Sequence, residues 1–206
     1  MYISRIKLNI SNSKAMQAIS SPQVVHALVE GCFVQKNRTL WRMDSLGGNL
    51  YLLIVSKEEP NFDDLATQLC ERGEIGHTKN YASFLTKIEN GQRLRFRFRG
   101  NTVHSVVKNK GERGKVKPYF SEKNKREWVL KKAEKNGFVL EENDFAMVDT
   151  GQQRFNKRAS RNHVELSYAT FEGVLTVADS EKFVTALTQG IGRGKAYGCG
   201  MMTVIM

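Results

Sequence analysis

The end of the chain restricts its fold most, because five glycines lie between a helical pattern that ends near residue 189 and an apolar run over residues 201–205. Phosphate-binding loops of dinucleotide-binding and P-loop proteins have the opposite order, strand, glycines, helix, so that the phosphate meets a helix N-terminus. The spacing also fails, since a P-loop requires Gly at the position of Gln189 and Ser or Thr at that of Ala196. A nucleotide site of either kind is therefore not indicated.

This glycine segment, residues 190–200, carries two cations, Arg193 and Lys195. Glycine adopts positive φ at no steric cost, so the loop can bring bare backbone amides and both cations close to a polyanion. The alternative is a glycine-rich turn with ordinary surface cations. Both interpretations predict a helix, a loop and a final strand.

The net charge of +11 is concentrated in one half of the chain. Residues 1–90 contain ten Lys and Arg against nine Asp and Glu, a net of +1, whereas residues 91–206 contain twenty-two against twelve, a net of +10. A basic half beside a neutral half predicts a polyanionic partner, most commonly nucleic acid. The alternative is a basic protein that has no such partner.

Composition narrows the class of protein further. No apolar run approaches the length of a membrane span, and the first residues lack the charged start and apolar middle of a signal peptide, so we expect a soluble, cytoplasmic protein without a membrane partner. Cys32, Cys70 and Cys199 are far apart and form no CxxC pair. They indicate neither disulfides nor a zinc site, and we interpret them as packing residues.

The first half predicts the element order β-α-β-β-α-β. Residues 2–10 alternate as a strand, and Ser21 with Pro22 begins a helix that runs to about residue 33. A hairpin over residues 39–56 turns at Gly47 and Gly48, a short helix covers residues 60–72, and residues 81–88 supply a last strand. This order is that of the ferredoxin-like or RRM-like fold, an antiparallel sheet with both helices on one face.

On the first of these helices, His26 lies where the buried face meets solvent, beside Val25 and Val29 and one turn before Glu30. Near the N-terminus of a helix the dipole disfavours the imidazolium cation and favours neutral imidazole, which is the form that a general base needs. The pattern alone is more often that of a structural or exposed histidine.

The second half begins with arginines at a strict period of two, with apolar residues between them, over residues 92–99. This pattern predicts a strand with one cationic face, neutralised either by a phosphate backbone or by cross-strand carboxylates. Residues 100–120 predict a mobile basic loop that includes Lys108, Lys110 and Arg113.

A helix is predicted over residues 121–137, followed by strands over 145–149 and 164–177. The segment between these strands has no carboxylate and carries four cations, Arg154, Lys157, Arg158 and Arg161. It is either a hairpin tip that enters an RNA groove or holds a scissile phosphate, or a disordered surface turn. Asp179 starts the last helix, which leads into the glycine segment.

The second half therefore repeats the order β-α-β-β-α-β. We predict an α+β protein of tandem ferredoxin-like (RRM-like) domains with antiparallel sheets, related by internal duplication. The first domain covers residues 1–90 and carries His26; the second covers residues 91–206 and carries the basic hairpin and the glycine-rich loop.

Several of these segments together resemble the CasE-type CRISPR repeat endoribonucleases of type I-E systems. They come in the family's order and cover nearly the whole chain: residues 2–8, SPQVVH at 21–26, QRLRFRFRGN at 92–101, residues 128–138, FEGVLTV at 171–177 and GIGRGKAYGCG at 190–200. The resemblance implies cleavage of a repeat stem-loop in precursor CRISPR RNA without metal or cofactor. It also implies that the product is retained and that other Cascade subunits are partners.

The resemblance places the family's catalytic histidine at His26 and its active-site lysine in the basic hairpin, where Lys157 is our choice. Family members often have Tyr three residues before the histidine, where this chain has Gln23, which cannot act as a general acid. Either His26 acts alone or a hairpin cation takes part. The remaining cations are candidates for RNA binding: Arg93, Arg95, Lys108, Lys110, Arg113, Arg154, Arg158, Arg161, Arg193 and Lys195.

An alternative function is that of a non-catalytic protein that binds structured RNA through two RRM-like domains. RRMs stack bases on paired aromatic residues of their central strands, whereas the corresponding runs here are mainly aliphatic. A ribosomal or assembly protein, which would bind structured RNA without preference for a repeat hairpin, is a third hypothesis.

Overall fold

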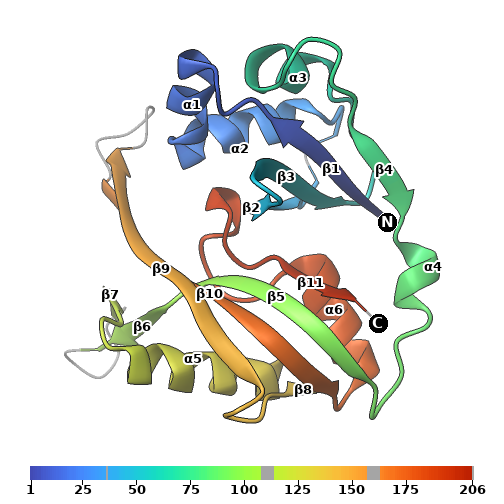
Figure 1. Ribbon diagram of the computed structural model, residues 1–206. Coiled ribbons are helices and arrows are strands. Elements are labelled where there is room, and N and C mark those ends of the chain that lie inside the picture. The colour runs from blue at the N-terminus through green and yellow to red at the C-terminus, as the bar shows by residue number, and fades with distance from the viewer. Residues whose placement is uncertain (36, 108–113, 157–162, 206) are drawn as a thin grey trace.

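The computed structural model describes residues 1–35, 37–107, 114–156 and 163–205. Their two larger sheets are antiparallel, a four-stranded one within residues 2–80 and a five-stranded one within residues 93–205. In Figure 1 the sheets lie one above the other, with helices on their outer sides. No helix in the described ranges has the length and apolar character needed to span a membrane.

The first sheet has the order β2-β3-β1-β4, and its strands are β1 (Tyr2–Leu8), β2 (Leu40–Leu46), β3 (Asn49–Ser56) and β4 (His77–Asn80). The helices α1 (Ser13–Ile19), α2 (Pro22–Gly31) and α3 (Asp63–Leu69) cover one face. Alternate residues of β1, Ile6 and Leu8, pack under the helix residues Val25 and Val29, because strand side chains alternate between the two faces.

The second sheet has the order β11-β5-β10-β8, with β9 also paired to β10. Its strands are β5 (Arg93–Asn101), β8 (Phe138–Val139), β9 (Phe145–Asn156), β10 (His163–Val177) and β11 (Met202–Ile205). The helices α5 (Glu122–Lys135) and α6 (Ser180–Gln189) pack on one face. Both halves are thus ferredoxin-like, and the predicted α+β class with tandem antiparallel sheets is confirmed.

The predicted strand over residues 81–88 is wrong. The edge strand that pairs with β1 is β4, and it is followed by the short helix α4 (Ala82–Leu85), whose N-cap residue is Tyr81; the amide of Ala82 donates to Asn80 Oδ1 at 2.9 Å. Tyr81, Leu85 and Ile88 are buried, and their spacing of four and three residues is that of a helix. The sequence of β4 is polar and has no alternation of apolar residues, because an edge strand does not need a buried apolar face.

Several further elements were not predicted, among them the two-residue strand β8. The helix α1 precedes α2, and its N-cap Asn12 accepts hydrogen bonds from the amides of Lys14 and Ala15 at 2.9 and 3.1 Å. The predicted basic loop contains a small hairpin of β6 (Val103–Val106) and β7 (Lys115–Pro118). Residues 108–113, which hold Lys108, Lys110 and Arg113, lie outside the described residues.

The two halves share an interface. Leu40 and Val55 of the first sheet belong to the same buried cluster as Phe96 and Met202 of the second. Within that interface Arg42 of β2 is only 1% exposed. It donates to the main-chain oxygens of Arg97 and Met201 at 2.8 and 3.0 Å.

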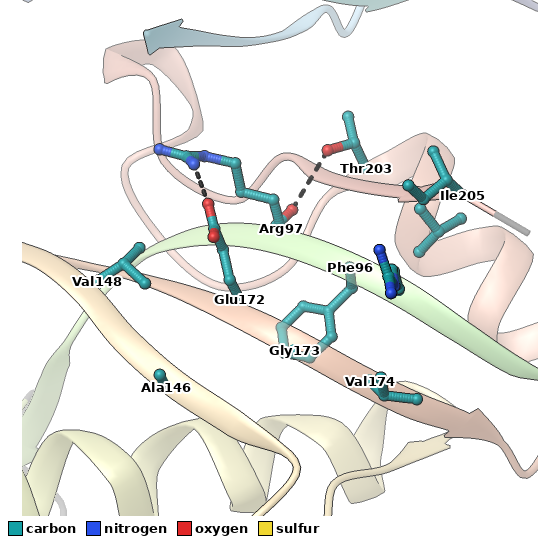
Figure 2. A pocket seen from close by; sticks show the side chains of 11 residues that line it. Phe96, Arg97, Ala146, Val148, Glu172, Gly173, Val174, Thr203 and Ile205 are labelled. Atoms are coloured by element: carbon teal, nitrogen blue, oxygen red, sulfur yellow. Dashed lines mark hydrogen bonds and ion pairs between the residues drawn. The ribbon is translucent and has the colours of Figure 1, made fainter. Parts of the chain in front are cut away.

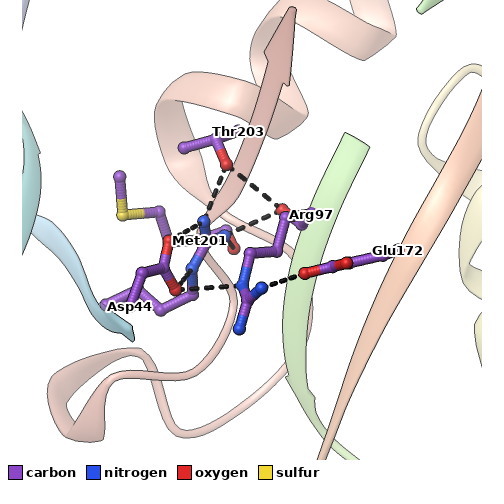
Figure 3. Close-up of polar contacts among 6 residues, drawn as sticks. Asp44, Arg97, Glu172, Met201 and Thr203 are labelled. Atoms are coloured by element: carbon purple, nitrogen blue, oxygen red, sulfur yellow. Dashed lines mark hydrogen bonds and ion pairs between the residues drawn. The ribbon is translucent and has the colours of Figure 1, made fainter. Parts of the chain in front are cut away.

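The Arg42 guanidinium also forms a two-pronged ion pair with Asp44, at 2.8 Å from Nε to Oδ1 and 2.6 Å from Nη2 to Oδ2, and donates to Thr203 Oγ1 at 2.7 Å. Figure 3 shows this network between β2, β5 and β11. Because its partners lie in strands of both sheets, it fixes one domain against the other.

The three cysteines are free thiols, with Cys32 and Cys199 buried and Cys70 half-buried. Burial raises the pKa of Cys32 to about 12 and that of Cys199 to about 11. Both thiols therefore stay protonated at neutral pH and act as small apolar side chains, in agreement with the packing role predicted for them.

Candidate functional site between the two domains

His26 lies on the second turn of α2, as the sequence predicted. The helix begins at Pro22 with Ser21 as its N-cap residue, and the fully buried Val25 and Val29 fix its inner face. The imidazole is 30% exposed, and its Nε2 atom lies 3.4 Å from the Oε1 atom of Glu30, one turn further along the helix. A half-exposed imidazole of this kind can exchange protons with a bound substrate.

The glycine segment lies against the helix that carries His26. It contains the 3₁₀ turn η1 (Lys195–Tyr197), flanked by Gly194 and Gly198 with φ of 80° and 76°. The Tyr197 ring approaches the imidazole of His26, with ring centroids 6.2 Å apart and planes at 67°. The loop and the histidine, about 170 residues apart in sequence, thus belong to one site.

Strand β9 also reaches the contact between Tyr197 and His26. Phe155, near its end, contacts the Tyr197 ring edge to face, with centroids 4.9 Å apart and planes at 70°. Lys157 follows Phe155 by two residues in the sequence, and residues 157–162, which also contain Arg158 and Arg161, lie outside the described residues.

Cations gather around the glycine loop. Burial and the nearby charge of Arg38 lower the pKa of Lys195, whose Nζ donates to the main-chain oxygen of Gln189 at 2.6 Å. Burial, Lys135 and Arg193 lower the pKa of Lys132 in the same way. In the described part of the chain none of these five side chains forms an ion pair with a carboxylate. A bound anion would relieve their mutual repulsion.

A sequence model of the CRISPR associated protein family matches residues 1–205. The chain belongs to this family. The CRISPR-associated endoribonuclease Cse3 of Thermus thermophilus is 26% identical over 225 residues, covering 99% of each chain. The CRISPR system Cascade subunit CasE of Escherichia coli is 26% identical over 125 residues, 57% of this chain and 60% of that one. The resemblance predicted from the sequence is confirmed.

The fold is shared with solved members of the family. The structure of CRISPR endoribonuclease Cse3 bound to a 19-nucleotide RNA superimposes with a TM-score of 0.82 at 23% identity, and the match covers 100% of both chains. Both ferredoxin-like halves and the segments that join them therefore have counterparts in that protein.

The arginine strand of this CRISPR-associated protein is β5, and its cations have different surroundings. Arg93 pairs with Asp144 at 2.8 Å. Arg97 contacts its cross-strand neighbour Glu172 and lies 3.1 Å from Asp44, so carboxylates neutralise these two arginines, as one alternative predicted.

The other two arginines of β5 have no carboxylate partner among the described residues. The Arg99 guanidinium lies 3.7 Å above the ring of Tyr168, whereas Arg95 is exposed. Arg95 lines a groove of about 470 Å³ on the face of the sheet away from α5, together with Val148, Thr203 and Ile205 (Figure 2). Arg93 and Arg95 are the predicted RNA contacts on this strand, and Arg95 is therefore the more accessible of the two to an RNA phosphate.

Arg154 is exposed on β9 and pairs with its cross-strand neighbour Glu165 at 2.9 Å. It lines a second groove, of about 730 Å³, with Lys117 and Phe120. Figure 1 shows that β9 runs from this side of the second domain up to α1 and α2. Arg154 thus lies on the strand whose Phe155 contacts Tyr197 beside His26.

Sequence reasoning missed three residues of the site: Tyr197, Phe155 and Arg38. Tyr197 lies inside the glycine segment that the sequence singled out, but nothing in its spacing indicated a contact with α2. Gln23, three residues before His26, lies half-buried on the first turn of α2. Among the described residues, no three His, Cys, Asp or Glu side chains are grouped so that they could hold a metal ion.

Proposed function

We propose that this protein is a metal-independent endoribonuclease that cleaves precursor CRISPR RNA at the repeat stem-loop. The single observation that carries the proposal is His26, held half-exposed where the two domains meet and in ring contact with the glycine loop, whose Lys195 has no carboxylate partner among the described residues. The named activity of the Thermus relative and the Cascade membership of the Escherichia relative support it. The protein acts in the cytoplasm and keeps its product within Cascade.

The proposed reaction uses the RNA's own nucleophile, the 2′-hydroxyl next to the scissile phosphate. The O2′–P bond forms as the P–O5′ bond breaks, so the products are a 2′,3′-cyclic phosphate, or the 3′-phosphate derived from it, and a 5′-hydroxyl. His26 accepts the hydroxyl proton or protonates the leaving O5′ atom. Lys157 and its neighbours stabilise the negative charge of the phosphorane.

The domains have separate parts in this proposal. Residues 1–90 supply His26, and residues 91–206 supply the basic hairpin, the glycine loop and most of the charge. Arg95, Arg193 and Lys195, which lack carboxylate partners among the described residues, contact the phosphate backbone. Arg93 and Arg154 are exposed enough to exchange their carboxylates for phosphates.

The test is cleavage of a labelled repeat hairpin in EDTA. We expect His26→Ala to slow single-turnover cleavage by about a thousandfold, with the Kd for the hairpin within about twofold, because the arginines and lysines of the second domain supply the contacts proposed to hold RNA. His77→Ala, an exposed histidine on β4, is the matched control and should cleave normally. Near-normal cleavage by His26→Ala would refute the assignment.

The same experiment separates the alternative function. If the wild-type protein shifts the hairpin without cutting it, the protein is a structured-RNA binder. One observation disfavours binding through the first sheet in the manner of an RRM: Ile3, Leu53 and Val55, on its face away from the helices, pack against the core of the second domain.

A further inference from the structure

We infer that Tyr197, in the glycine loop of the second domain, is a positioning residue that holds the imidazole of His26 for reaction. The inference rests on the cleavage proposed above and assigns a role to a residue that sequence reasoning did not single out. Its basis is the contact between a ring of one domain and the candidate general base of the other.

The contact has the geometry of a favourable aromatic pair. Aromatic rings prefer edge-to-face or offset arrangements with centroids about 4.5–7 Å apart, and the rings of Tyr197 and His26 are 6.2 Å apart at 67°. Glu30 lies 3.4 Å from Nε2 of the same imidazole. Two groups from different elements therefore restrict the rotation of the ring about its side-chain bonds.

Tyr197 is itself held in place by the loop. Its amide donates to the main-chain oxygen of Gly194 at 2.9 Å, which closes the turn, and Gly200 ties the loop to β5 through a 2.6 Å hydrogen bond to the main-chain oxygen of Arg99. A Cβ atom at Gly198 would lie 2.8 Å from the Trp41 ring, so glycine allows the loop to sit close to β2. Phe155 contacts the Tyr197 ring and limits its movement.

The ring, not the hydroxyl group, carries this role. The described contacts of Tyr197 with His26 and Phe155 are both ring contacts. A reacting group displaced by about 1 Å can cost up to about a hundredfold in rate. Loss of the Tyr197 ring should therefore slow cleavage, while the cations that hold RNA stay in place.

The experiment compares Tyr197→Leu and Tyr197→Phe by single-turnover cleavage in EDTA at saturating protein, and by the Kd for a hairpin with a 2′-deoxy nucleotide at the cut. We expect the leucine variant to be about tenfold to a hundredfold slower, with Kd within about twofold. The phenylalanine variant should restore the rate to within about threefold, because it keeps the ring. Tyr51→Leu on β3, whose ring lies under the Arg5 guanidinium and forms no described ring contact with His26, is the matched control.

Each other outcome overturns the inference. Wild-type rates in Tyr197→Leu remove the positioning role, and equal losses in Tyr197→Leu and Tyr197→Phe assign the effect to the hydroxyl group. A loss of affinity that accounts for the slower cleavage makes the loop an RNA contact only. Tyr197→Met, whose unbranched side chain fills the same space, gives the same test if the leucine variant does not fold.

Failure of the wild-type protein to cleave refutes the proposed function itself. If His26→Ala is defective but the Tyr197 variants cleave normally, only the role of Tyr197 is refuted.

Discussion

At the scale of single residues, Lys195 is a lysine whose charged form is disfavoured by its position in the fold. Burial lowers its pKa from the ordinary value of 10.5, and the nearby Arg38 lowers it further. The folded chain therefore releases this proton at lower pH than the unfolded chain, so the lysine's contribution to stability rises as pH increases through its folded pKa. A phosphate at the loop would act in the opposite direction, because it favours the charged form.

We predict that RNA binding weakens as Lys195 loses its proton. As the pH rises above neutral, the Kd for an uncleavable repeat hairpin should rise severalfold, about 1 kcal/mol for one surface charge pair. Lys195→Arg keeps its charge over this range and should flatten the dependence. Fluorescence anisotropy across the pH series provides the measurement, and parallel curves for the two proteins would exclude Lys195 as a phosphate contact.

Single residues also show how far the sequence could lead. His26 could be singled out because an amphipathic helix fixes which of its side chains lie at the edge of the core, and this depends on local spacing alone. Tyr197 could not, because its partner belongs to the other domain, and such a contact depends on how two folded sheets dock. The cations of the glycine loop were predicted, but their like-charge neighbours Arg38 and Lys132 are tertiary contacts of the same kind.

At the scale of elements, the glycine loop is shaped by backbone conformations that other residues rarely adopt. Gly198 has φ of 76°, and a Cβ atom there would meet the Trp41 ring at 2.8 Å. The side chain of Trp41 is 2% exposed and has little room to move. Gly198 therefore sets both the path of the loop and its distance from β2.

We predict that Gly198→Ala destabilises the protein by about 1–3 kcal/mol, the usual cost of a strained backbone position. Gly48→Ala is a useful comparison, because that hairpin glycine has a similar φ of 76° but open space around it. Urea denaturation should show the larger loss for Gly198→Ala. Equal losses would mean that backbone strain alone, and not the contact with Trp41, accounts for the effect.

The order of elements followed from the sequence where hydrophobic periodicity was strong. The hairpin at Gly47 and Gly48, the helices that begin after Ser21 and Asp179, and strand β5 all lie close to their predicted bounds. The edge strand β4 was missed because it is short and polar, and pairing with β1 rather than burial holds it. An apolar run at residues 81–88 was mistaken for it, although the spacing of its buried residues is helical.

At the scale of the whole molecule, the two domains behave as one packed unit. Buried side chains of both sheets form a continuous cluster, and Arg42 links β2 to β5 and β11 through a buried guanidinium. The position of His26 relative to Tyr197 depends on this docking, because each residue belongs to a different domain. The interface is therefore part of the proposed site.

We predict that Arg42→Met lowers the free energy of unfolding by about 3 kcal/mol, since it breaks a buried ion pair with Asp44 and leaves main-chain oxygens of β5 and β11 without their donor. Arg5→Met, at an exposed position, should change it by less than about 0.5 kcal/mol. Urea denaturation measures both. Because loosened docking separates His26 from Tyr197, Arg42→Met should also slow cleavage more than it weakens RNA binding. A cleavage rate equal to that of Arg5→Met under folded conditions would show that the histidine is positioned within the first domain alone.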